Sequence, residues 1–162
     1  MTHMVEVTVF ASAALVMALV AGVFLAFSDF VMRSLRVATP ATGVEAMQQI
    51  NRKVYGSVFL VGLLGLAPVS LGLAGYGVMS MSGPAAGWII VGGLIYFTGT
   101  FLVTMLGNVP MNQRLDHMVL SAPETRDYWQ VYARDWTRWN HLRTAASAIG
   151  SVCLLIGLVL YA

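Results

Sequence analysis

Four long apolar stretches limit what this chain can fold into. About 20 apolar residues form a helix that crosses the ~30 Å hydrocarbon core of a bilayer. The last stretch, residues 145–162, contains no charged residue. Across all 162 residues, 58% are hydrophobic and only 10% are charged, which is not the composition of a soluble domain. We therefore expect an all-α integral membrane four-helix bundle: a single transmembrane domain over residues 1–162, with spans at about 5–27, 54–75, 87–106 and 145–161.

The positive charges indicate how such a bundle would be oriented. All nine Lys and Arg residues fall between the first and second spans or between the third and fourth, and both termini lack them. Loops rich in Lys and Arg stay on the cytoplasmic side. This predicts a multi-pass protein of the plasma (inner) membrane with both termini extracytoplasmic and membrane lipid as its surroundings. No dense basic stripe is present, so we expect no nucleic-acid partner; an oligomer is possible.

Two capping-box patterns predict where helices begin outside the membrane. Thr42 is followed by Glu45, and Ser121 is followed by Glu124, each at the spacing at which the two residues cap a helix start. We expect helices two and four to begin near Val44 and Ala122, to extend several turns beyond the membrane at the cytoplasmic end, and to run on into their spans.

Polar side chains gather at the cytoplasmic end of every predicted span. Such groups are costly beside lipid unless they face one another or a cavity. We therefore predict one semi-polar pocket at that end, roofed by the extensions of helices two and four. A fully hydrogen-bonded network without a cavity is the structural alternative. The residues concerned are Ser28, Asp29, Gln48, Asn51, Asn108, Asn112, Asn140 and His141.

The segment 136–144 combines Trp, Arg, Asn, His and Thr at the start of the last span. Trp and Arg are common at the membrane interface, which explains Trp136, Trp139 and Arg143 without a site. The interfacial explanation accounts less well for Asn140 and His141. Trp129, Tyr132, Trp136 and Trp139 also recur every three or four residues, an aromatic stripe that either packs in the core or lines a ligand site.

Several of these segments together resemble the anthrone-oxygenase-like family of small four-helix membrane proteins. The most specific are Gly-Asn-Val-Pro-x-Asn, at residues 107–112, and Trp-x-x-Trp-Asn-His, at residues 136–141; residues 27–30 and 47–51 also match. The resemblance covers nearly the whole chain. It implies oxygenation of a polyketide anthrone to an anthraquinone without an obvious cofactor. The Trp and His of the family motif match Trp139 and His141.

The leading functional interpretation is therefore a cofactor-independent membrane oxidoreductase that uses O₂ on a flat, apolar, phenolic molecule of anthrone type. Such chemistry needs a base, donors for a developing oxyanion and a water-poor aromatic slot. Histidine is the side chain best suited to act as a base near neutral pH. We expect His141 as the base with Asn140 and Asn108 as catalytic donors. Expected substrate contacts are Trp136, Trp139, Asn112, Asn51, Gln48, Asp29 and Arg143.

Two alternatives stay open at this point. The site could bind a redox cofactor, namely haem through a single His or a quinone, or the protein could be a non-enzymatic membrane subunit whose polar cluster docks a partner. A metal site is not expected, because zinc or copper would need three or more ligands and the pattern offers one convincing His. An acid beside an Arg at the interface is the plain explanation of Asp29, four residues before Arg33.

The charge distribution gives a first test. Reporter fusions to the C-terminus, after Ala162, should report an extracytoplasmic location, because the last apolar stretch follows a loop rich in arginine. A C-terminal fusion that is active only in the cytoplasm would overturn the predicted orientation.

Overall fold

A computed structural model describes residues 2–162, and within that range all regular secondary structure is helical. Four continuous helical stretches are long and apolar enough to cross a membrane. The all-α, four-helix fold predicted from the sequence is thereby confirmed. These stretches, which can run through more than one helical element, are His3–Val37, Val58–Ser80, Pro84–Asp116 and Pro123–Tyr161.

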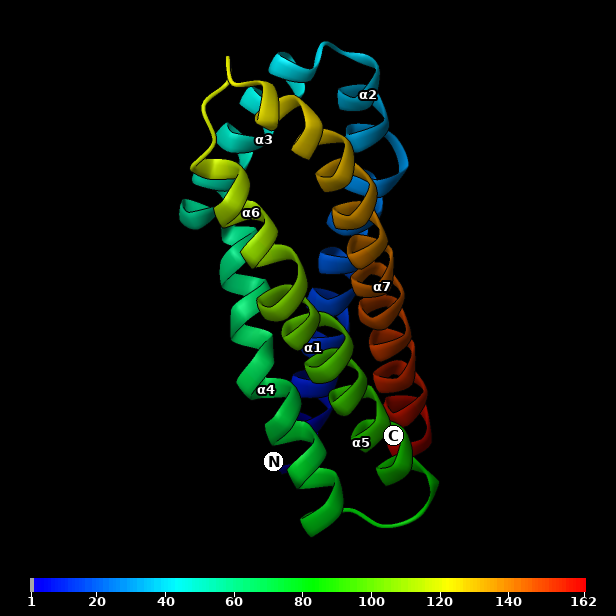
Figure 1. The fold of residues 1–162 in the computed structure, drawn as a ribbon. Helices are drawn as coiled ribbons and strands as arrows, with labels where there is room; N and C mark the ends of the chain where they lie inside the picture. The colour runs from blue at the N-terminus through cyan, green and yellow to red at the C-terminus, as the bar shows by residue number, and fades with distance from the viewer. Residues whose placement is uncertain (1) are drawn as a thin grey trace.

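The four stretches lie side by side, and Figure 1 shows both termini at the same end of the bundle as the α4–α5 connection. The short helices α2 and α3 lie at the opposite end, which we call the loop end. The elements in chain order are α1 (Thr2–Ala26), a π-helical turn (Phe27–Val31), α2 (Met32–Val37), α3 (Pro40–Lys53), a 3₁₀ turn (Val54–Gly56), α4 (Val58–Ser80), α5 (Pro84–Ile95), π-helical segments (Tyr96–Leu102 and Thr104–Asn108), α6 (Val109–Asp116) and α7 (Pro123–Tyr161).

The extension before the second span differs from the prediction in two ways. Its cap is Thr39, whose hydroxyl accepts from the Thr42 backbone N–H at 3.3 Å, so the predicted capping box at Thr42 is wrong. Pro40 at the first turn favours this earlier start, because proline fits where the backbone N–H has no helical partner. The helix also does not continue into the span. The chain turns at Val54–Gly56, and Ser57 caps α4 by accepting from the Leu60 N–H at 3.2 Å.

The extension before the fourth span begins and continues as predicted, with a different cap. Helix α7 has 39 residues and starts at Pro123 after Ala122, which has no side-chain cap. The predicted capping role of Ser121 is therefore wrong. Instead, the Thr125 hydroxyl donates to the Val119 carbonyl at 2.7 Å and closes the turn ahead of the helix. At 1.5 Å per residue α7 is about 58 Å long, roughly twice a hydrocarbon core.

The third stretch is longer than predicted, since it continues past Leu106 to Asp116. Two π-helical segments interrupt its α-helical pattern, and Pro110 lies in the first turn of α6 just after the second of them. Pro110 has no N–H to donate, and it lies where the π-helical segment has already interrupted the regular α-helical hydrogen-bond pattern. Asn108 and Asn112 are thereby carried on a helix beside α7 rather than on a loop.

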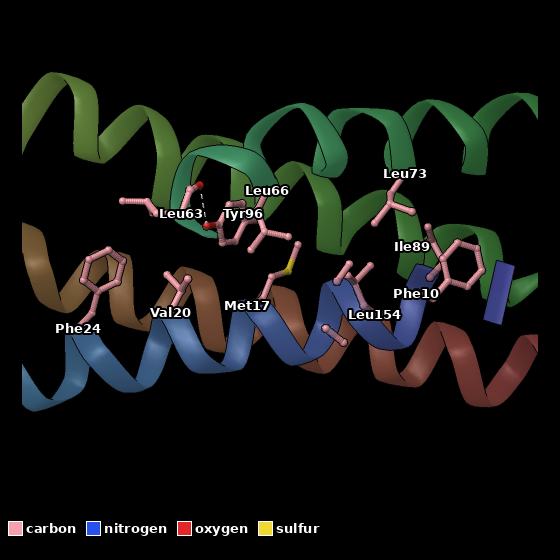
Figure 2. Close-up of a cluster of buried hydrophobic side chains, with 12 residues drawn as sticks. Phe10, Met17, Val20, Phe24, Leu63, Leu66, Leu73, Ile89, Tyr96 and Leu154 are labelled. Carbon is pink, nitrogen blue, oxygen red and sulfur yellow. Dashed lines mark hydrogen bonds between the residues drawn. The ribbon is translucent and has the colours of Figure 1, made fainter. Parts of the chain in front are cut away.

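Two clusters of buried apolar side chains hold the helices together. The larger lies along the span region, where Phe10 and Met17 of α1 meet Leu66 of α4 and Leu154 of α7 (Figure 2). The hydroxyl of buried Tyr96 donates to the Leu63 carbonyl at 3.1 Å, shown as a dashed line in that view. The second cluster lies at the loop end and consists of Met32, Val44, Met47, Leu115, Tyr128, Trp129, Tyr132, Ala133 and Trp136.

Glycines allow the closest helix contacts. A Cβ atom on Gly93 of α5 would overlap the backbone carbonyl oxygen of Ser70 on α4, whereas one on Gly72 would meet nothing within 4 Å. Small residues at helix interfaces permit the close packing that drives association in lipid. The α4–α5 contact therefore depends on the missing side chain at position 93.

We predict that Gly93→Ala destabilises the detergent-solubilised protein, because backbone atoms must move apart to accept the methyl group. Overpacking of this kind costs about 1–3 kcal/mol, measurable as a lower midpoint in thermal unfolding. Gly72→Ala is the matched control and should be neutral or slightly stabilising, since alanine favours helix. An unchanged midpoint for Gly93→Ala would contradict the close α4–α5 packing.

Candidate functional site

A cavity of about 390 Å³ lies between α1, α3, α4, α6 and α7 near the loop end. Cavities of roughly 300–1,000 Å³ are typical of small-molecule sites. Its walls are mostly aliphatic and aromatic, and the turn between α3 and α4 brings Lys53 and the exposed Tyr55 to its edge. The lining residues are Val23, Phe24, Phe27, Met47, Ile50, Asn51, Lys53, Val54, Tyr55, Ser57, Phe59, Leu60, Leu63, Thr104, Val109, Asn112, Trp136 and Arg143.

Among the residues that the structure describes, Arg143 of α7 is the only buried cation that lines this cavity. Its side chain lies over the Phe24 ring at 4.1 Å and near the Trp136 ring at 5.3 Å, measured from the guanidinium carbon to the ring centroids. Such cation–π contacts partly offset the loss of water. One terminal nitrogen donates to Asn140 Oδ1 at 2.7 Å, and the other approaches Thr104 Oγ1 at 3.5 Å.

The charge of Arg143 has no acidic partner among residues 2–162. The ion pairs found in that part of the chain involve Arg33, Arg52, Arg134 and Arg138, all partly or largely exposed. Arg143 is only 4% exposed, and its Nε has no hydrogen-bond acceptor. Buried charges are normally paired, because an unpaired one costs several kcal/mol in lost hydration. The site therefore holds an unmatched positive charge beside empty space.

Asn140 holds Arg143 in place rather than facing the cavity. Its Nδ2 donates to the Phe24 carbonyl and to Ser28 Oγ, both at 2.6 Å, at the point where α1 passes into its π-helical turn. Its Oδ1 accepts from Arg143. Both hydrogens of the Asn140 amide are therefore used, and this arrangement leaves none for the predicted donation to a substrate.

The two most specific motifs of the sequence pack directly against each other. Asn108 Nδ2 donates to the Trp136 carbonyl at 3.2 Å, and Asn112 Oδ1 accepts from the Trp136 indole N–H and the Tyr132 hydroxyl, both at 2.9 Å. A Cβ on Gly107 would lie 2.9 Å from the Trp139 ring. Asn108 is buried in this contact and does not line the cavity, so its predicted catalytic role has no support, whereas Asn112 does line it.

Other predicted residues are placed outside the cavity. His141 is exposed and does not line it, so the prediction that this histidine faces a pocket is wrong. Asp29 is also exposed and pairs with Arg33 at 3.6 Å, which agrees with the explanation of Asp29 as an acid beside an arginine at the interface.

Two further predicted substrate contacts also lie outside the cavity. Trp139 is 43% exposed and lines a separate groove on the outer side of α7 with Arg138. Gln48 is buried, and its amide holds the chain after α6 by donating to the Leu115 and Met118 carbonyls.

The structure thus brings together Asn51, Asn112, Trp136 and Arg143 around one cavity, with Asn108 and Asn140 in a hydrogen-bonded layer beside it. The Asn51 amide nitrogen is buried and has no hydrogen-bond acceptor. A pocket and a structural network are therefore both present. The sequence interpretation did not identify the walls Phe24, Phe59 and Leu60 or the hydroxyl of Thr104, because single apolar residues inside spans look alike in sequence.

A family model described as anthrone oxygenase matches residues 45–153. The chain belongs to the anthrone oxygenase family. The match includes Asn51, Asn112, Trp136 and Arg143 but not the α1 residues of the cavity wall. No curated protein and no solved structure matches the chain. The family points to an oxygenase-like function, and the four apolar helices point to a multi-pass membrane protein.

In the part of the chain that the structure describes, no three His, Cys, Asp or Glu side chains lie together in a way that would hold an ion. His141, which was considered as an axial haem ligand, lies outside the cavity, and Cys153 is buried within the span region of α7.

The two hydrogen bonds that Asn112 accepts from α7 lead to a prediction about stability. Asn112→Ala leaves the Trp136 indole and Tyr132 hydroxyl without their acceptor, and each unsatisfied buried donor costs about 1–3 kcal/mol. We expect a clearly lower thermal unfolding midpoint. Exposed Gln113→Ala on the same helix should leave the midpoint unchanged. Equal behaviour of the two variants would show that the Asn112 bonds do not hold α6 to α7.

Proposed function

We propose that this protein is a membrane oxygenase that oxidises a flat, apolar, phenolic molecule of anthrone type with O₂ in the cavity beside Arg143, without a bound cofactor. The observation that carries the proposal is a buried guanidinium with no acidic partner, set in an aromatic cavity. Family membership supports oxygenation as the class of reaction. The cavity beside Arg143 supports the proposed location of the substrate.

The cavity suits a planar aromatic molecule with oxygen atoms at its edge. Phe24, Phe27, Phe59 and Trp136 offer aromatic surface, and aromatic pairs stabilise one another beyond the area they bury. The polar groups of the lining lie among these walls rather than covering them. A molecule with an apolar body would pack against the aromatic side chains, and an oxygen atom at its edge would accept a hydrogen bond from Arg143.

The reaction we propose balances without a cofactor. Loss of a proton from the activated methylene gives an enolate, whose electrons reduce O₂. One oxygen atom is retained as the new carbonyl of the anthraquinone, and the other leaves as water with the two methylene hydrogens. Arg143, with the Asn51 amide N–H beside the same cavity, would stabilise the enolate oxygen, since donors aimed at developing charge contribute strongly in a water-poor site.

The source of the base differs from the sequence prediction. Among the described residues that line the cavity there is no Asp, Glu or His. We therefore assign proton removal to water or hydroxide rather than to His141, and attribute the lowered barrier to the electrostatic effect of Arg143. The proton then leaves through the cavity edge near Lys53 and Tyr55.

The setting of the site remains part of the proposal. With both termini extracytoplasmic in a plasma (inner) membrane, the loop end and its cavity lie on the cytoplasmic side. An apolar aromatic substrate would then reach the cavity from the surrounding lipid, in which it is far more soluble than in water.

The test is anthrone conversion by the purified full-length protein, followed together with dissolved oxygen. Wild type should exceed the spontaneous background, and Arg143→Met should lower the rate by about 10²–10³, the usual cost of removing one oxyanion donor. His141→Gln should retain the wild-type rate, because its side chain is exposed outside the cavity. Arg138→Met, which removes an exposed arginine from the same helix, is the charge control.

Two results would contradict parts of this account. Anthrone conversion no faster than background would remove the proposed reaction. Loss of turnover in a well-folded His141→Gln protein would return the catalytic role to that residue and displace the cavity as the site.

A further inference from the structure

The charged side chains that line the cavity are all cations. Two buried donors of the lining, Arg143 Nε and Asn51 Nδ2, have no acceptor within hydrogen-bond distance, although the Asn51 amide faces the Tyr132 hydroxyl. The unpartnered acceptor Asn108 Oδ1 belongs to a residue that does not line the cavity. The remaining charged group of the lining is Lys53, a second cation, at the cavity edge. Among the described residues that line the cavity, the unpartnered buried polar atoms are therefore donors, and the charged groups are cations with no acid to balance them.

The groups that contact Arg143 from the neighbouring helices are neutral. The Phe24 ring of α1 covers its guanidinium, and the Thr104 hydroxyl approaches it from the π-helical segment before α6. On α7 itself, it contacts the Asn140 amide and the Trp136 ring. Besides Arg143, the ionisable side chains of the described lining are Lys53 and Tyr55. Tyr132 does not line the cavity, but its hydroxyl donates to the lining residue Asn112. None of these side chains is a carboxylate.

We infer that this cavity binds its ligand as an oxyanion, with Arg143 as the counter-ion, and so shifts the acid–base equilibrium of a bound phenol or enol toward the ionised form. The inference rests on the proposed function for the choice of an aromatic phenol or enol. The anion site itself follows from the unpaired guanidinium. Arg143 thereby has a specific role, because the cation makes the substrate acidic enough that the protein supplies no base of its own.

The size of the shift follows from known ion pairs. An arginine next to a carboxylic acid typically lowers the pKa of that acid by about 1–3 units. Burial opposes the effect because it disfavours any charge, so the net shift in the apparent pKa of a bound phenol should lie toward the lower part of that range. A neutral cavity of the same shape would give the opposite sign.

The experiment uses 2-hydroxyanthraquinone, whose visible absorption moves to longer wavelength when its phenol ionises. The full-length protein in detergent is titrated with pH in the presence of this probe. We expect the midpoint of the bound probe to fall by about one or more pH units relative to detergent alone. Arg143→Met should abolish the shift, Arg143→Lys should retain part of it, and Arg138→Met should behave like wild type.

A matched pair of ligands tests the anion site independently of ionisation. Anthraquinone-2-carboxylate is charged at neutral pH and anthraquinone-2-carboxamide is not, while their shapes are nearly identical. The carboxylate should bind wild type at least about tenfold more tightly, a difference of ~1.4 kcal/mol. That preference should disappear in Arg143→Met and persist in Arg138→Met.

Each result decides between the proposals. A bound probe that ionises at or above its midpoint in detergent, or a carboxamide that binds as tightly as the carboxylate, would overturn the inference even if anthrone turnover is observed. Carboxylate preference without anthrone turnover would leave the anion site standing and remove the oxygenase proposal. If wild type binds neither member of the pair, the cavity is not an aromatic anion site.

Discussion

The charge of the buried Arg143 guanidinium, which no carboxylate among residues 2–162 neutralises, is the constraint that fixes the polar contacts around the cavity. A cation can remain in such a place only when neutral groups from several helices surround it. Asn140 accepts from it and is itself bound to the Phe24 carbonyl and Ser28 of α1, and the Phe24 ring covers its face. At the loop end, residues that join α1 to α7 therefore also hold the charge beside the cavity.

The two sequence motifs acquire a physical meaning from the same arrangement. Gly107 leaves room for the Trp139 ring, Asn108 binds the Trp136 carbonyl, and Asn112 fixes the Trp136 indole. One motif is thus the packing surface for the other. Few of their members contact the cavity, so most of what makes these motifs distinctive is the frame of the site rather than its chemistry.

Much of the fold could be predicted from the sequence because the length of the apolar stretches is a strong signal. The cap at Thr39 is not evident from the sequence because the capping-box pattern that begins three residues later, at Thr42, is the stronger local signal. The turn at Val54–Gly56 is marked only by Gly56 and Ser57, two residues that a continuous helix also tolerates. The polar cluster was located correctly, but which side chains face inward was not. His141 and Arg143 are two residues apart on α7, and their opposite exposures depend on a helix rotation that only packing fixes.

The central claim is that Arg143 is kept for function at a cost in stability. Thermal unfolding of ligand-free Arg143→Met tests it most directly. Removing a buried charge that has no ionic partner recovers the several kcal/mol lost when it was dehydrated, whereas leaving Asn140 Oδ1 without its donor costs about 1–3 kcal/mol. The account therefore predicts an unfolding midpoint equal to or above that of wild type, despite the lost bond to Asn140. A midpoint many degrees lower would show that the guanidinium is a structural element of the bundle, and would contradict the account.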